Sequence, residues 1–152
     1  MTEVVVPAAA DMQALGSRLA DVLRAGDLVV LSGDLGAGKT TLVQGIGAGL
    51  GVSGAVVSPT FVIARVHRGG RLPLVHVDAY RLGSVAEVDD LDLDAELDES
   101  VTVVEWGEGL VEDLAGDRLE IRLERSSDPG EETRRVTLTG VGERWATADW
   151  PT

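Results

Sequence analysis

Residues 31–42 of the chain read Leu-Ser-Gly-Asp-Leu-Gly-Ala-Gly-Lys-Thr-Thr-Leu, and this stretch constrains the fold more than any other. Gly33, Gly38, Lys39 and Thr40 match the pattern G-x-x-x-x-G-K-[ST] at every fixed position. A glycine-rich stretch that ends on Lys-Thr also arises by chance as an ordinary turn. The flanking sequence therefore decides between a structural turn and a phosphate-binding loop.

The flanking residues favour the phosphate-binding loop. An apolar run of strand length, residues 28–31, precedes the pattern, and apolar side chains recur at helical spacing after it, at Leu42, Ile46 and Leu50. Strand, glycine loop and helix are the context that this pattern requires. Lys39 is also the only lysine in the chain, since all the other basic residues except the two histidines are arginine. We therefore predict a nucleotide phosphate site.

Each residue type in the loop has a physical role. Glycines allow backbone N–H groups to turn inward around phosphate oxygens, and the N-terminus of the following helix adds partial positive charge. Lys39 can reach the β- and γ-phosphates and the Thr40 hydroxyl can bind Mg²⁺. We expect Lys39 to meet solvent when the site is empty. The residues predicted to contact the nucleotide here are Gly33, Asp34, Leu35, Gly36, Ala37, Gly38, Lys39, Thr40 and Thr41.

Two acidic residues are candidates for the catalytic and metal-binding carboxylates. Asp78 follows the mostly apolar residues Leu74-Val-His-Val77, and Glu105 follows the mostly apolar residues Val101-Thr-Val-Val104. Each is expected at the carboxyl edge of a parallel sheet, where ligands bind in open α/β folds. An acid at a strand end can also simply face water, and the sequence does not decide which of the two acts as general base or direct metal ligand. Thr60 is either a switch residue near the γ-phosphate or a turn residue after Pro59.

Hydrophobic patterning predicts the other elements. Val4–Val6 is a candidate edge strand, and Asp11 is a plausible N-cap for an amphipathic helix. Residues 61–66 and 72–77 read as two strands joined by the turn 68–71, with His76 a packed or edge histidine. Alternation over 119–123 and 135–138 indicates a C-terminal hairpin. In the helix after the phosphate loop, glycines 45, 47 and 49 each cost about 1 kcal/mol against alanine, which close approach of a neighbouring backbone would offset.

Length and composition bound the fold class. The 152 residues are expected to form one α/β P-loop domain, with three layers, over residues 1–140 and a tail over 141–152. Its sheet would be mixed and mostly parallel, with a C-terminal antiparallel hairpin. The chain has no cysteine, which excludes disulfides and thiolate metal sites. No basic-then-apolar N-terminal signal and no membrane-length apolar run is seen, so we predict a cytoplasmic protein without membrane contact.

The net charge and the absence of a guanine-recognition signature limit which ligands the chain is expected to bind. The net charge is −13, so a nucleic acid would have to be held by a basic partner. The Asn-Lys-x-Asp signature that reads guanine cannot be present because the chain contains no asparagine. Adenine is favoured, and ATP with Mg²⁺ is the predicted cofactor pair.

Four motifs together resemble the TsaE (YjeE) family, the bacterial ATPase subunit of the tRNA threonylcarbamoyladenosine system. They are Gly33–Thr41, Ser58-Pro-Thr-Phe61, His76-Val-Asp-Ala-Tyr-Arg-Leu82 and Val104-Glu-Trp106, in the family's order and spacing over roughly residues 8–125. The resemblance implies that Thr60 is the switch threonine, Asp78 the Walker B-like acid and Glu105 a metal-side or catalytic acid, with Trp106 flanking the site. Met12 departs from the family pattern, which commonly has threonine near the adenine.

The resemblance implies ATP hydrolysis that resets a TsaB–TsaD complex between rounds of tRNA modification, with tRNA reached only indirectly. The family's own subunit is not the threonylcarbamoyl transferase, and alone this chain is expected to be a weakly active monomer. Two alternatives are a small-molecule kinase, which would need an acceptor pocket and an arginine-bearing lid, and a non-hydrolytic, nucleotide-gated binding module.

Overall fold

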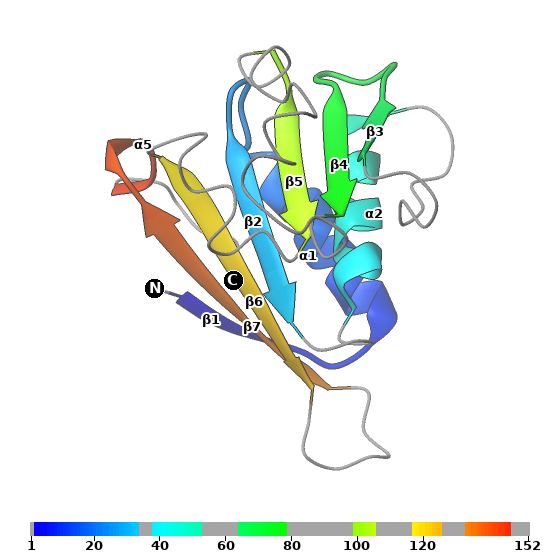
Figure 1. The fold of residues 1–152 in the computed structure, drawn as a ribbon. Helices are drawn as coiled ribbons and strands as arrows, with labels where there is room; N and C mark the ends of the chain where they lie inside the picture. The colour runs from blue at the N-terminus through cyan, green and yellow to red at the C-terminus, as the bar shows by residue number, and fades with distance from the viewer. Residues whose placement is uncertain are drawn as a thin grey trace.

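The computed structural model describes residues 2–33, 38–52, 64–78, 99–105, 117–125 and 133–146, which form one sheet with two long helices on one of its faces (Figure 1). The strands are Thr2–Val6 (β1), Leu28–Gly33 (β2), Ala64–His67 (β3), Leu74–Asp78 (β4), Val101–Glu105 (β5), Arg118–Arg125 (β6) and Arg134–Val141 (β7). The helices are Ala9–Ala20 (α1), Lys39–Leu50 (α2) and the short Glu143–Ala146 (α5).

The sheet has seven strands in the order β1-β7-β6-β2-β5-β4-β3. The central strands β6, β2, β5 and β4 run parallel to one another. Antiparallel pairs flank them: β3 pairs with β4, β7 with β6, and β1 with β7. The predicted mixed, largely parallel sheet is therefore confirmed, as are the C-terminal hairpin β6–β7 and the edge strand at the N-terminus.

The two central strands are buried on both faces. All of β5 and the first four residues of β2 are buried. Val29 and Val103 belong to the core that the helices cover, whereas Val30 and Val104 face the other way and are 3% and 0% exposed. Parallel strands buried on both sides read as continuous apolar runs, which is the pattern the sequence shows here. Within the described residues, helices cover one of the two faces.

Helix α1 begins at Ala9 with Ala8 as its N-cap, so the prediction of Asp11 as the N-cap is wrong. Alanine is the strongest helix former, and the run Ala8–Ala10 extends the helix towards its N-terminus by one turn. Asp11 instead lies in the first turn, where a carboxylate interacts favourably with the helix dipole. The predicted apolar face is confirmed, because Met12, Leu15 and Leu19 are buried.

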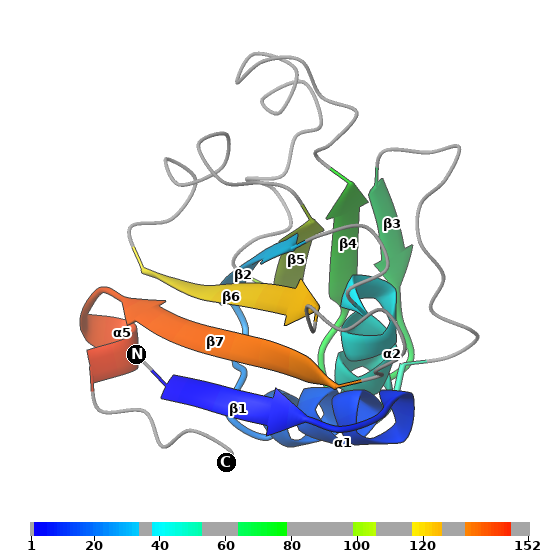
Figure 2. The ribbon, with the colours of Figure 1, turned by 90° about the horizontal axis from the view of Figure 1, so that it is seen from below.

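Helices α1 and α2 lie side by side (Figure 2). Three glycines at their contact allow this close approach. A Cβ at Gly45 would lie 2.9 Å from the Gln13 Cα atom, and one at Gly49 would lie 2.8 Å from the Ser17 carbonyl oxygen. On the α1 side, a Cβ at Gly16 would lie 2.8 Å from the backbone nitrogen of Ile46. The expectation that neighbouring backbone offsets the glycine cost is thus confirmed at positions 45 and 49.

Substituting Gly45→Ala is expected to lower the free energy of unfolding by about 2 kcal/mol. Overpacking costs about 1–3 kcal/mol, and here the obstructing atoms are backbone, so the helices must separate; the gain in helix propensity offsets about 1 kcal/mol at most. The melting temperature would fall by roughly 4–8 °C. Ala48→Leu is the control, since it enlarges an exposed residue of α2 and should change stability by about 0.5 kcal/mol or less. An unchanged melting temperature for Gly45→Ala contradicts the packing argument.

Arg71, at the end of the turn between β3 and β4, ties the C-terminal ends of both long helices together. Its guanidinium donates hydrogen bonds to the carbonyl oxygens of Ala20 (2.5 Å) and Leu23 (3.2 Å), and its backbone N–H donates to Leu50 O (2.7 Å). Cations stabilise helix C-termini, where carbonyl groups lack partners within the helix. The turn 68–71 predicted from the sequence is confirmed and includes Gly69 at φ 101°.

The start of the C-terminal tail covers the sheet rather than extending from it. Trp145 of α5 is 3% exposed and belongs to the hydrophobic core. Its neighbour Arg144 reaches Asp27, which directly precedes β2. Residues 147–152 lie outside the described part of the chain. Among the described helices, none is long and apolar enough to cross a membrane.

Candidate functional site

The two fixed glycines of the phosphate-loop pattern hold the ends of the loop. Gly33 is the last residue of β2, and Gly38 is the N-cap of α2 with the left-handed backbone angles φ 103° and ψ 18°. A side chain at Gly33 would meet the backbone of Leu123 in the neighbouring strand β6. Glycine is therefore required at one end by close approach and at the other by backbone conformation. Residues 34–37, predicted to contact the nucleotide, lie outside the described residues.

Lys39 is buried, and the expectation that its amine meets solvent is wrong. The residue is 7% exposed, and Nζ donates a 2.8 Å hydrogen bond to the carbonyl oxygen of Gly33. This bond spans the loop from the first turn of α2 back to the end of β2. The amine thus reaches from the start of α2 to the end of β2, where a phosphate group bound at the helix N-terminus would lie close to it.

The remaining predicted residues of α2 directly follow Lys39 in the sequence. Thr40 and Thr41 occupy the first turn of the helix and are half-buried. Across from them, Met12 of α1 packs against the loop: a Cβ at Gly38 would lie 3.2 Å from its Cε atom. The sequence singled out Met12 only as a departure from the family pattern, and its contact with Gly38 follows from the packing of α1 against α2.

Both predicted acids lie at the same edge of the sheet as the loop. In the strand register, Glu105 of β5 lies opposite Leu31 of β2 on one side and opposite Asp78 of β4 on the other. Gly33 follows Leu31 by two residues, so the carboxyl ends of three adjacent parallel strands meet where the loop starts. For Asp78 the structure describes this backbone position. Thr60 and Trp106, the other predicted contacts, lie outside the described residues.

Glu105 is held by a residue whose role the sequence did not indicate. Glu105 is 4% exposed, and its Oε2 atom lies 2.8 Å from Nε2 of His76, which is fully buried in β4. The sequence placed His76 as a packed or edge histidine, and packing is confirmed. The hydrogen bond to Glu105 joins residues 29 positions apart and depends on the strand order β5-β4, which no local pattern gives.

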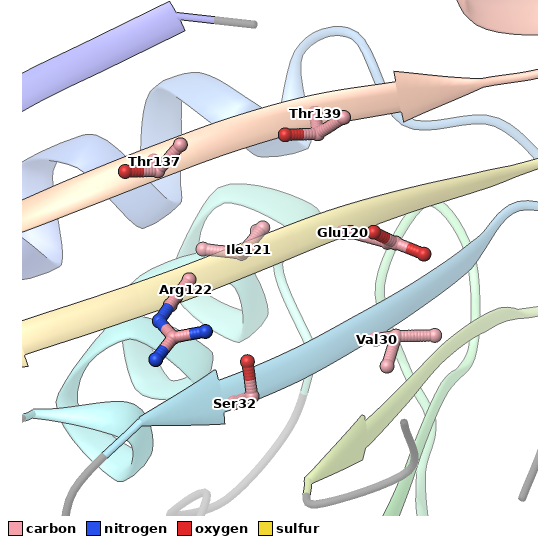
Figure 3. Close-up of a pocket in the computed structure, with 7 residues that line it drawn as sticks. All are labelled: Val30, Ser32, Glu120, Ile121, Arg122, Thr137 and Thr139. Atoms are coloured by element: carbon pink, nitrogen blue, oxygen red, sulfur yellow. The ribbon is translucent and has the colours of Figure 1, made fainter. Parts of the chain in front are cut away.

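A hollow of about 230 Å³ lies on the opposite face of the sheet, across β2, β6 and β7 (Figure 3). Its polar side chains alternate with the core residues of these strands and so point away from α1 and α2. The hollow shares no residue with the predicted nucleotide site, although Ser32 immediately precedes Gly33. The lining residues are Val30, Ser32, Glu120, Ile121, Arg122, Thr137 and Thr139.

A glycine loop between a buried parallel strand and a helix, with acids at the same sheet edge, defines a P-loop NTPase-like fold. The crystal structure of Bacillus subtilis YdiB is similar, with a TM-score of 0.77 at 33% sequence identity, covering 95% of this chain and 88% of that one. The family model described as "Threonylcarbamoyl adenosine biosynthesis protein TsaE" matches residues 6–136. The chain belongs to the TsaE family, as its motifs indicated.

Relatives named tRNA threonylcarbamoyladenosine biosynthesis protein TsaE are similar over most of the chain. The protein from Streptomyces coelicolor is 66% identical over 142 residues, covering 91% of this chain and 96% of the relative. That from Mycobacterium leprae is 56% identical over 124 residues, covering 76% and 77%. That from Bacillus subtilis is 40% identical over 136 residues, covering 89% and 83%.

Proposed function

We propose that this chain binds and hydrolyses Mg²⁺–ATP and thereby supports threonylcarbamoylation of the adenosine next to the anticodon in tRNA. It acts on a TsaB–TsaD complex and reaches tRNA only through those partners. The observation that supports the proposal is the buried Lys39, whose amine bonds to the carbonyl oxygen of Gly33 at the sheet edge where Glu105 also lies. Membership of the TsaE family supports the tRNA-modification role.

The residues present fit a magnesium nucleotide. Lys39 and the N-terminus of α2 offer positive charge to phosphate oxygens, and Gly38 provides the left-handed N-cap at which the helix begins. Thr40 supplies a hydroxyl oxygen and Glu105 a carboxylate oxygen, the ligand types that Mg²⁺ prefers. The Glu105 carboxylate also has acceptor capacity left for a metal ion. It is buried and has a single hydrogen-bond partner among the described residues, whereas a carboxylate can accept several hydrogen bonds.

Hydrolysis needs positioning and charge stabilisation more than covalent chemistry. Bound Mg²⁺–ATP supplies the γ-phosphate that water attacks and a metal that neutralises the developing charge. Lys39 orients the phosphates, and Glu105 and Asp78 orient the water or the metal from the ends of β5 and β4. Slow turnover by the chain alone is expected, since a cation contributed by a partner is worth a factor of roughly 10³–10⁵ in phosphoryl transfer.

The overall charge fits a subunit that leaves tRNA to its partners. With 26 acidic and 13 basic residues, the chain carries a net charge of −13. Proteins that bind nucleic acid directly gain most of their affinity by neutralising phosphates with Lys and Arg. Direct tRNA binding by this chain in isolation is therefore not expected.

Titration calorimetry with ATP and Mg²⁺ tests the nucleotide site. The wild-type chain is expected to bind ATP in preference to GTP, and Lys39→Ala to bind it about 30-fold more weakly, because a hydrogen bond to a charged group is worth about 1.5–3 kcal/mol. Arg122→Ala is the matched control: it removes one positive charge from an exposed residue on the opposite face of the sheet and should leave the ATP affinity unchanged.

Because Lys39 also bonds to Gly33, each variant needs a thermal melt to show that it is folded at the assay temperature. A folded Lys39→Ala variant with wild-type ATP affinity would exclude this loop as the phosphate site. The role in modification is tested by adding the chain and ATP to purified TsaB–TsaD-type partners and tRNA. Multiple rounds of threonylcarbamoylation should require the chain, and equal product without it would reject that role.

A further inference from the structure

Two buried polar residues on adjacent strands form a pair at the nucleotide edge of the sheet. His76 of β4 is 0% exposed and the Glu105 side chain of β5 is 6% exposed, and the ring Nε2 lies 2.8 Å from Oε2. Strand alternation places Glu105 on the sheet face of Val101 and Val103, which the helices cover. The pair therefore lies on the same side of the sheet as α2 and the phosphate loop.

The hydrogen bond fixes the direction of the carboxylate. An ionised carboxylate only accepts, so Nε2 of His76 carries the donated proton. In the register His76 lies opposite Val103, two residues before Glu105, so the bond draws Oε2 back along β5. The second oxygen, Oε1, has no partner in the described part of the chain. The bond thus engages one oxygen and leaves the other to act at the carboxyl edge.

The histidine has no second function visible in the described residues. Its other ring nitrogen, Nδ1, is buried and has no hydrogen-bond partner among the described residues, so within them Glu105 is the one polar contact of the ring. Glu105 likewise has the His76 ring as its only partner within these residues. Removal of the imidazole would leave a buried carboxylate with no donor, a state that proteins avoid by reorienting the group.

We propose that His76 is a positioning residue: it holds the Glu105 carboxylate in the orientation that the nucleotide site uses. The inference rests on the proposed function, since it assumes that Glu105 acts on Mg²⁺ or on the attacking water. A residue that orients a metal or catalytic ligand typically contributes 10–100-fold to metal affinity or activity. His76 touches neither nucleotide nor metal in this scheme and acts only through Glu105.

A pair of His76 variants tests the role. His76→Gln keeps an N–H donor of similar reach, whereas His76→Leu removes the donor and keeps an apolar side chain. We expect His76→Leu to lower the hydrolysis rate about 10-fold and to weaken the Mg²⁺ dependence of ATP affinity, with the affinity in EDTA unchanged. His76→Gln should restore a large part of both. Thr102→Val is the matched control, because it removes a buried, unpartnered hydroxyl from the opposite face of β5 and should leave both unchanged.

A double-mutant cycle separates positioning from a purely structural role. In a Glu105→Gln background, His76→Leu should cause no further loss of rate, because its effect is transmitted through that carboxylate. Equal loss of thermal stability in both His76 variants, with wild-type rates and Mg²⁺ dependence, would overturn the inference. Additive rate losses in the cycle would do so as well. If the wild-type chain binds no ATP, that result rejects the proposed function itself and not only the positioning role of His76.

Imidazole nitrogen NMR on the nucleotide-free protein gives a readout that is independent of activity. The chain has two histidines, so the His67→Gln variant assigns the remaining ring to His76. We expect a protonated Nε2 whose resonance shifts in Glu105→Ala and is unaffected by Thr102→Val. A proton on Nδ1 with Nε2 bare would contradict the hydrogen bond and with it the positioning role.

Discussion

Glu105→Gln is expected to reduce ATP hydrolysis by about 100-fold or more while the chain still binds ATP. A positioned carboxylate that accepts a proton contributes typically 10²–10⁴-fold, and the amide keeps the size of the side chain but loses the charge. The His76 ring can still donate to the amide oxygen, so the local packing of β4 against β5 should survive. Single-turnover hydrolysis of radiolabelled ATP, in excess enzyme with and without partner proteins, measures the loss.

The Mg²⁺ dependence of the same variant distinguishes the two roles that the sequence leaves open for this acid. If Glu105 binds or orients the metal, Glu105→Gln raises the Mg²⁺ concentration needed for half-maximal rate. If Glu105 is the general base, saturating Mg²⁺ does not restore the hydrolysis rate of the variant. Glu124→Gln is the control, because that carboxylate is about half exposed on β6 and its pairs among the described residues are with surface arginines. A Glu105→Gln variant that hydrolyses ATP at the wild-type rate would remove Glu105 from the mechanism.

The sequence predicted the strands best where a single physical signal dominates. The apolar runs 28–31 and 101–104 became the buried central strands, and the alternation over 119–123 became β6. These patterns are local, since burial on one face or on both is set by which residues alternate. The start of α1 was missed because Asp11 carries a strong capping signal, whereas a run of alanines gives no polar signal at all.

The loop pattern selects the candidate site residues, but it does not predict how their side chains are held. Lys39 is buried and its amine bonds to Gly33 O, a contact between the start of α2 and the end of β2 that the polarity of a lysine does not predict. The His76–Glu105 bond depends on β4 and β5 being neighbours, with Glu105 two residues beyond the position opposite His76. Strand order and register arise from the whole fold, so spacing along the chain does not reveal such a pair.

Arg144→Ala is expected to destabilise the fold by about 3 kcal/mol, the largest effect on stability foreseen for a single substitution here. The guanidinium makes a bidentate pair with Asp27, with Nε at 3.0 Å from Oδ1 and Nη2 at 2.9 Å from Oδ2. Nη2 also donates to the Val22 carbonyl oxygen at 2.6 Å, and the group lies 4.1 Å from the ring centroid of Trp145. These contacts join α5 to the segment between α1 and β2.

Burial makes the loss large. The Asp27 and Arg144 side chains are 6% and 16% exposed, and removing one partner of a buried pair typically costs 3–5 kcal/mol because the other charge is left uncompensated. Arg24 N would still donate to Asp27 at 2.7 Å, which favours the lower end of that range. The melting temperature should fall by roughly 6–12 °C. Arg135→Ala is the control, since its pair with Glu3 is more than half exposed and is worth about 1 kcal/mol or less.

The Asp27–Arg144 pair lies far enough from the candidate site that its removal should affect stability and not activity. Asp27 directly precedes β2, so the pair lies at the amino end of the strand whose carboxyl end carries the phosphate loop. Well below its melting temperature, Arg144→Ala should therefore bind ATP and hydrolyse it as the wild type does, whereas Glu105→Gln should melt normally and hydrolyse slowly. Differential scanning calorimetry and calorimetric ATP titration on the same samples measure both quantities. A melting temperature within about 2 °C of wild type, less than 1 kcal/mol for a chain of this size, would show that the pair adds little to the fold.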